Sequence, residues 1–241
     1  MYAGAFFYGG IMQNTKNSTG YFHLKEIALW ASSAALIIVS FCLFDRENYM
    51  TLAASLIGVS SLILNAKGHP IGQALMIIFS LLYGIISYSF SYYGEMLTYL
   101  GMTMPMAVFS LISWIRHPYE GKRSEVKVNA IGKREVLLML LASAVVTCAF
   151  YFILVHFKTA IIIPSTISVT TSFIAAYLTF RRSPYFALAY AANDVVLIVL
   201  WIMASVENTV YISVVVCFST FLINDIYGFL SWKRMKARQT A

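Results

Sequence analysis

Eight long apolar segments constrain what this 241-residue chain can fold into. A helix of about 20 apolar residues crosses roughly 30 Å of bilayer hydrocarbon, so we expect each segment to be a transmembrane helix. The segment at 50–65 is short, and if it does not cross the bilayer the chain has seven spans. The eight segments comprise residues 26–44, 50–65, 71–90, 96–115, 135–156, 160–180, 184–204 and 209–231.

The composition agrees with a membrane protein. Hydrophobic residues make up 60% of the chain and charged residues 11%, and the mean hydropathy is +0.75. Soluble domains have about 45–50% apolar and about 25% charged residues, so the apolar excess must face lipid. Three cysteines, Cys42, Cys148 and Cys217, lie far apart within apolar segments and predict neither a disulfide nor a metal site. The composition therefore argues against soluble enzymes, secreted disulfide scaffolds and nucleic-acid binding.

The basic residues predict the orientation. When the N-terminus is placed in the cytoplasm, 15 of the 17 Lys and Arg residues fall on the cytoplasmic side, and only Arg46 and Lys158 fall outside. Both termini are then cytoplasmic. The net charge of +7 reflects this topology and attraction to anionic lipid.

The longest hydrophilic stretch divides the helices into two groups of three. One helix separates the groups, so both cross the membrane in the same sense, as parallel repeats preceded by an extra helix. Ser113-Trp114 and Ser231-Trp232 occupy matching places in the two groups. The predicted parts are an N-terminal interfacial segment without a signal peptide (1–24), an extra transmembrane helix and loop (25–49), a first three-helix repeat (50–115), a basic cytoplasmic loop (116–134), a linking helix (135–156), a second repeat (160–232) and a basic cytoplasmic tail (233–241).

Two carboxylates lie within predicted spans. Asp194 is near the middle of its span and Asp225 is nearer a helix end, and each follows an asparagine, Asn193 or Asn224. An Asp at a helix centre costs about 2.5–3.5 kcal/mol on insertion, so such a residue needs a partner or an aqueous cavity. The pairs predict either a polar binding pocket or a clamp between the last two helices.

Polar side chains also recur at helical spacing. Asn193 and Trp201 share a helix face because they are eight residues apart. Such stripes suit a passage for a polar aromatic solute, whereas the individual serines equally favour close helix packing. The stripes consist of Gln73, Ser80, Tyr83 and Ser87 in one span and Ser213, Thr220, Asn224, Tyr227 and Ser231 in another.

Aromatic residues at helix ends predict a membrane-interface belt. Trp114 and Trp232 stand beside basic residues at the predicted cytoplasmic ends, and Tyr88, Tyr92, Tyr93 and Tyr99 stand near the outer ends. The sequence contains no phosphate-binding loop, nucleophile elbow or HExxH motif, and no lysine inside a span for a retinal Schiff base. We therefore predict no enzyme, cofactor or metal site.

Several motifs resemble the PnuC-type nicotinamide riboside transporter family over roughly residues 50–235. In the first half they are the run from Asn65 to Gln73, then Tyr83-Gly84, and Tyr92-Tyr93-Gly94-Glu95. In the second half they are Ser183-Pro184-Tyr185, Asn193-Asp194, Trp201, Asn224-Asp225-Ile226-Tyr227-Gly228 and Ser231-Trp232.

The resemblance implies an all-α membrane protein similar in architecture to SWEET transporters, with one pathway per subunit of a homotrimer. It implies facilitated diffusion of nicotinamide riboside, an NAD precursor, across the bacterial inner membrane, with a cytosolic kinase trapping it. On matching positions, Gln73 and Asn193 would bind the amide or ribose, Trp201 would stack on the ring and Asp194 would meet the pyridinium charge. The other implied substrate-binding residues are Tyr83, Asn224, Asp225 and Tyr227.

Other functions stay open at this stage. The stretch Phe186-Ala187-Leu188-Ala189-Tyr190 stands where some family members carry tryptophans, so carriers for thiamine, riboflavin or deoxynucleosides are alternatives. A membrane-embedded enzyme or sensor would use Asp194 and Asp225 as paired acids, which requires the two carboxyls to lie close together. A structural subunit would instead bury the polar stripes in helix contacts.

Overall fold

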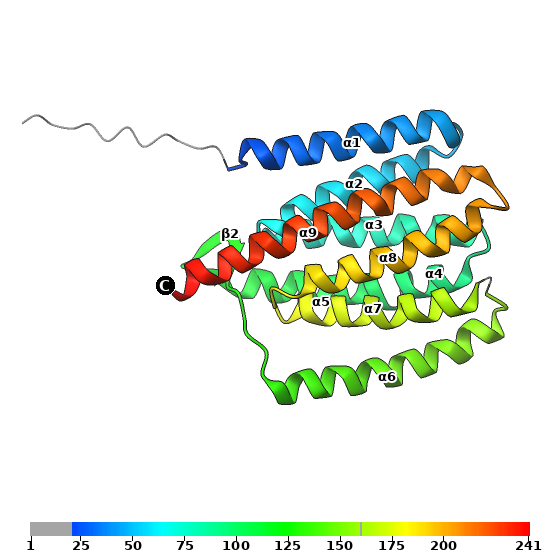
Figure 1. The fold of residues 1–241 in the computed structure, drawn as a ribbon. Helices are drawn as coiled ribbons and strands as arrows, with labels where there is room; N and C mark the ends of the chain where they lie inside the picture. Colours follow the sequence, from blue (N-terminus) through cyan, green and yellow to red (C-terminus); the bar gives the residue numbers. More distant parts are fainter. Residues whose placement is uncertain (1–20, 160) are drawn as a thin grey trace, which may run out of the picture.

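The computed structural model describes residues 21–159 and 161–241, so most of the predicted interfacial segment 1–24 lies outside the described residues. The fold is helical, with one small β-hairpin (Figure 1). In chain order the elements are α1 (Leu24–Phe44), α2 (Tyr49–Ala66), α3 (Pro70–Ser89), α4 (Tyr93–Thr98), the π-helical turn η1 (Tyr99–Thr103), α5 (Met104–Arg116), β1 (Pro118–Tyr119), β2 (Lys122–Val126), α6 (Lys133–His156), α7 (Ile162–Phe180), α8 (Phe186–Ser205), the 3-10 turn η2 (Thr209–Tyr211) and α9 (Ile212–Thr240).

The described residues contain eight helices long and apolar enough to cross a membrane, which confirms the eight predicted segments. One of them is built from α4, η1 and α5 in succession, and α2 has 18 residues. The predicted tail at 233–241 differs, because α9 continues as a helix to Thr240. This stretch lacks Gly and Pro, and its basic residues suit the negative end of the helix dipole.

Six spans form the core, and two helices flank it. Figure 1 shows α1 along one side, against α2 and α9, and α6 on the opposite side, against α7. In α6 only Met139, Ser143 and Leu154 are buried. Both flanking helices therefore present long apolar faces to lipid.

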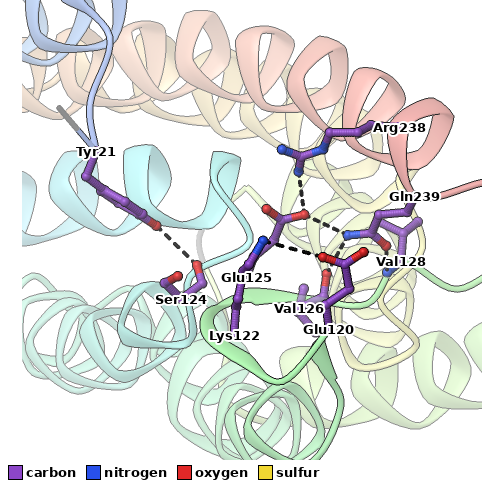
Figure 2. Close-up of polar contacts among 9 residues, drawn as sticks. All are labelled: Tyr21, Glu120, Lys122, Ser124, Glu125, Val126, Val128, Arg238 and Gln239. Carbon is purple, nitrogen blue, oxygen red and sulfur yellow. Dashed lines mark hydrogen bonds and ion pairs between the residues drawn. The ribbon is translucent and has the colours of Figure 1, made fainter. Parts of the chain in front are cut away.

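The basic loop between α5 and α6 contains the antiparallel hairpin β1–β2, at the same end of the bundle as the α2–α3 turn and the end of α9. We call this the hairpin end, and the opposite end the far end. Figure 2 shows Glu125 in an ion pair with Arg238 and accepting from Gln239 Nε2 at 2.8 Å. Tyr21 Oη donates to the Ser124 carbonyl at 3.2 Å. The hairpin thus holds the start of α1 and the end of α9 together.

The same loop joins the two halves of the core. The Val126 amide donates to the Gly68 carbonyl in the α2–α3 turn at 3.0 Å. The Asn129 amide and side chain donate to the carbonyls of Arg182 and Arg181 in the α7–α8 turn, at 3.0 and 3.1 Å. A segment predicted only as a hydrophilic loop therefore crosslinks the hairpin ends of both three-helix groups.

Candidate functional site

A small cavity lies in the middle of the core, and we call it the central cavity. Its volume is about 20 Å³. That is room for about one water molecule, whereas small-molecule sites occupy about 300–1,000 Å³. Rings of Phe79, Phe218 and Phe221 line it together with Leu62 and Met76. Its polar lining consists of Tyr99, Thr103, Ser172, Tyr190, Asn193, Asp194 and Asp225.

The pair Asn193-Asp194 in α8 forms one polar wall. Asn193 Oδ1 accepts from Thr171 Oγ1 at 2.8 Å and from Ser172 Oγ at 3.0 Å, so α7 fixes its amide. Asp194 lines the cavity together with Asp225 of α9. Asp194 Oδ2 is buried without a hydrogen-bond partner among the described residues. The cavity is therefore acidic, and its lining includes no Lys or Arg.

The π-helical turn η1 supplies a further part of the lining. Five residues, Tyr99–Thr103, adopt this rare geometry between α4 and α5, and Tyr99 and Thr103 line the cavity. Single π-helical turns are frequent at functional sites because they shift the face a helix presents. Thr103, Ser172 and Tyr190 were not predicted as site residues, and the predicted membrane-interface position of Tyr99 is wrong, because Tyr99 is buried and lines the cavity. The spacing of Tyr190, three residues before Asn193, would have identified it as sharing the Asn193 face.

Aromatic rings close the cavity toward the far end, and we call Tyr83, Tyr92, Trp201 and Tyr211 the aromatic layer. The Tyr83 ring lies 4.4 Å from Tyr99 and 6.4 Å from Trp201, between centroids. Trp201 packs at 4.8 Å on Tyr92 and at 5.3 Å on Tyr211. Tyr83 and Trp201, both predicted to touch substrate, thus lie beyond the cavity wall, and Tyr92 is buried rather than at a membrane interface.

A second aromatic cluster closes the core toward the hairpin end. The Trp232 ring lies 5.3 Å from Trp114 and 4.8 Å from Phe186. The Trp114 indole donates to the Thr179 carbonyl at 2.9 Å, and the Trp232 indole donates to the Asn65 carbonyl at 2.7 Å. The predicted interfacial role of both tryptophans is wrong, because both are fully buried and bond helix ends across the bundle.

Three other predicted site residues bond neighbouring helices instead of lining the central cavity. Gln73 Nε2 donates to Asn65 Oδ1 at 2.8 Å. Asn224 Nδ2 donates to Ser33 Oγ at 2.9 Å, and Tyr227 Oη donates to Glu26 Oε1 at 3.0 Å, both on α1. Adjacent helix residues point about 100° apart, so Asp225 facing the cavity turns Asn224 toward α1.

The contact with Tyr227 belongs to the docking of α1. Glu26 is buried and pairs with Lys67 of the α2–α3 turn at 3.0 Å. A wider cavity of about 420 Å³ opens beside this pair at the hairpin end, lined also by Glu125, Arg234 and Arg238. Most of its charged groups are already paired with one another, so the central cavity is the better candidate site.

Comparison with known proteins identifies the family. The family model described as nicotinamide mononucleotide transporter matches residues 48–234, which include every residue of the central cavity. The chain belongs to this family. It is 24% identical over 225 residues to the nicotinamide riboside transporter PnuC of Neisseria mucosa, covering 92% of this chain and 85% of that protein. The matched family region begins after α1.

A solved structure shares the fold. The crystal structure of the vitamin B3 transporter PnuC superimposes with a TM-score of 0.80 at 23% sequence identity, covering 90% of this chain and 94% of that one. The family consists of transporters, which sets aside the enzyme alternative even though Asp194 and Asp225 do come together. The predicted membership of a PnuC-type transporter family is confirmed.

Proposed function

We propose that the protein carries nicotinamide riboside across the bacterial inner membrane by facilitated diffusion. The observation that supports this most is the central cavity, where an amide, two carboxyls and several aromatic rings meet inside an apolar bundle. The names of the Neisseria mucosa relative and of the solved vitamin B3 transporter point to the same substrate class.

The cavity chemistry fits this substrate in three respects. The Asn193 amide is fixed by two hydroxyl groups and suits the carboxamide or ribose of the ligand. The Asp194 and Asp225 carboxyls suit the positive pyridinium ring, since opposite charges attract strongly at low dielectric. The phenylalanine and tyrosine rings suit its flat face. These residues replace the broader predicted set as the proposed binding residues.

Transport requires the cavity to open, because about 20 Å³ does not hold a riboside. We propose that α2, α3 and α4–α5 form one repeat and α7, α8 and α9 a parallel one, linked by α6 as in SWEET-like transporters. The reciprocal bonds of Trp114 and Trp232 support this, since each joins the third helix of one half to the end of the other half's first helix. Rocking of the halves would expose the cavity to each side in turn.

The hairpin end is proposed to face the cytoplasm, with both termini there. Basic residues concentrate at this end, among them Lys67, Arg116, Arg181 and Arg238. A facilitator cannot concentrate its solute, so we propose that a cytosolic kinase traps the riboside as a phosphate. A homotrimer with one pathway per subunit is proposed from the family resemblance.

The alternative substrates differ from one another in charge. Thiamine is an aromatic cation and suits the acidic cavity, whereas riboflavin and deoxynucleosides are neutral and gain nothing from the carboxyls. A ligand that binds the folded state raises its thermal stability by mass action. We expect nicotinamide riboside to raise the Tm of the purified protein most among these four compounds. A shift with riboflavin or a deoxynucleoside and none with nicotinamide riboside would refute the proposed substrate.

A further inference from the structure

Glu95 is a buried acid outside the central cavity that has no compensating partner. Its exposed fraction is 1%, and both carboxyl oxygens are buried without a hydrogen-bond partner among the described residues. None of the ion pairs in the described part of the chain includes it. Acids inside a membrane are costly, so an unpaired one usually marks a pathway for ions or substrate.

Helix geometry places Glu95 one helical turn before the cavity-lining residue Tyr99, toward the far end. The Tyr99 amide donates to the Glu95 carbonyl, so the two residues are one helical turn apart on one face. Tyr99 lines the cavity. One turn of helix rises about 5.4 Å, so Glu95 stands a single step outward from the cavity wall.

Packing at Gly94 fixes this position. A Cβ atom on Gly94 would lie 2.8 Å from Thr159 Cγ2 and 2.9 Å from Leu154 Cδ2, so α4 abuts the α6–α7 turn there. The next residue, Glu95, is buried, and Tyr99, one helical turn further along the chain, packs its ring 4.4 Å from that of Tyr83, between centroids. The acid is therefore held between the aromatic layer and the central cavity.

The surroundings of Glu95 suit a flat organic cation. The aromatic layer offers ring faces, which attract cations, and Asp194 with Asp225 lies deeper in the core. A positive ring entering from the far end would meet aromatic faces, then Glu95, then the two aspartates. A neutral ring would gain only the aromatic contacts.

We propose that Glu95 is a charge-selecting residue on the substrate path, which favours flat N-substituted aromatic cations over neutral rings of the same shape. The inference rests on the proposed function and on a far end that faces outside. It places charge recognition one step before the central cavity and assigns the transporter to aromatic cations as a class.

The test compares a charged and a neutral substrate of nearly equal shape. Initial uptake of labelled nicotinamide riboside and of its neutral 1,4-dihydro form is measured in vesicles containing the wild type, Glu95→Gln, Glu95→Asp or Glu207→Gln. Glu207 is an exposed acid at the same end, so its variant controls for the loss of one negative charge. We expect Glu95→Gln to slow uptake of the cation about tenfold and of the neutral form less than about twofold. Glu95→Asp should keep the preference for the cation, and Glu207→Gln should match the wild type.

Equal losses for both substrates in Glu95→Gln, or the same selective loss in Glu207→Gln, would overturn the inference. If the Glu95→Gln variant does not insert into the membrane, the wild type alone still tests the inference. Wild-type uptake of the neutral form at the same rate as the cation would overturn charge selection. Wild-type vesicles that take up neither compound would refute the proposed function itself, and the inference with it.

Discussion

The rings of Trp114 and Trp232 lie 5.3 Å apart between centroids, and each indole donates to a backbone carbonyl in the other half of the bundle. The acceptors, Thr179 and Asn65, sit near the ends of α7 and α2. This crossed pair ties the hairpin ends of both halves together directly beneath the central cavity. Movement that opens the cavity toward this end must break or shift these bonds.

The two crossed indole hydrogen bonds should contribute measurably to the free energy of unfolding. Trp114→Phe keeps an aromatic ring but removes the indole donor from the Thr179 carbonyl, which keeps the Arg182 amide at 2.9 Å, so we expect a loss of about 1 kcal/mol in the free energy of unfolding. Trp232→Phe should cost a similar amount. Trp30→Phe is the control, because the Trp30 indole is exposed and bonds Ser60 at the surface. Denaturation in detergent micelles measures all three, and equal effects at Trp30 and Trp114 would contradict this role.

A buried ion pair contributes to the docking of α1, beside the hydrogen bonds from Asn224 and Tyr227 of α9. Lys67→Met removes the cation that Glu26 contacts at 3.0 Å and leaves a nearly buried carboxylate. Breaking one side of a buried pair costs about 3–5 kcal/mol, so we expect a drop of about 3 kcal/mol and release of α1. Lys122→Met is the matched control, since its pair with Glu120 is exposed and such pairs contribute under about 1 kcal/mol. Limited proteolysis of α1 provides the readout, and protection equal to the wild type would argue against this docking.

Asp225 lines the cavity, whereas its neighbour Asn224 bonds α1, so substitutions of the two residues should have different effects. Asp225→Asn changes the acidic cavity, so nicotinamide riboside should bind about tenfold more weakly. Asn224→Ala removes the bond to Ser33 and should leave ligand affinity within about twofold while lowering the Tm. Calorimetric titration of both variants measures the affinities. Weaker binding in Asn224→Ala alone would place the site on the other face of α9.

His69 should make stability depend on pH. Burial lowers the pKa of His69, which lies in the turn between α2 and α3, and its Nδ1 accepts the Ile71 amide at the start of α3. A lowered pKa means that the folded state favours neutral His69. Its contribution is therefore full above the ordinary value of 6.5 and is lost as the pH falls through the lower folded-state pKa. His69→Asn keeps a cap acceptor without titrating, so the fall of the Tm below about pH 6.5 should be smaller in this variant. Identical Tm profiles for both proteins would exclude His69 as the cause.

The spans were predictable because hydropathy is a local property, and the central acids were predictable because a carboxyl in hydrocarbon needs a special environment. The sequence did not predict which polar residues of a helix face the cavity, because periodicity identifies a polar stripe but not the helix or cavity that the stripe contacts. The stripe through Asn224 and Tyr227 is real, but α1 covers it. The buried positions of Trp114 and Trp232 also depend on contacts over 65 and 167 residues, which no local pattern contains.

Counterflow is the most direct test of the central claim that nicotinamide riboside passes through the central cavity without a coupled energy source. Vesicles containing only this protein are loaded with unlabelled nicotinamide riboside and diluted into a trace of labelled compound, with no kinase and no ion gradient. We predict a transient accumulation of label in the wild type and at least about a tenfold slower one in Asn193→Ala, whose amide two hydroxyl groups fix at the cavity. No accumulation in the wild type, or the same time course in Asn193→Ala, would contradict the account.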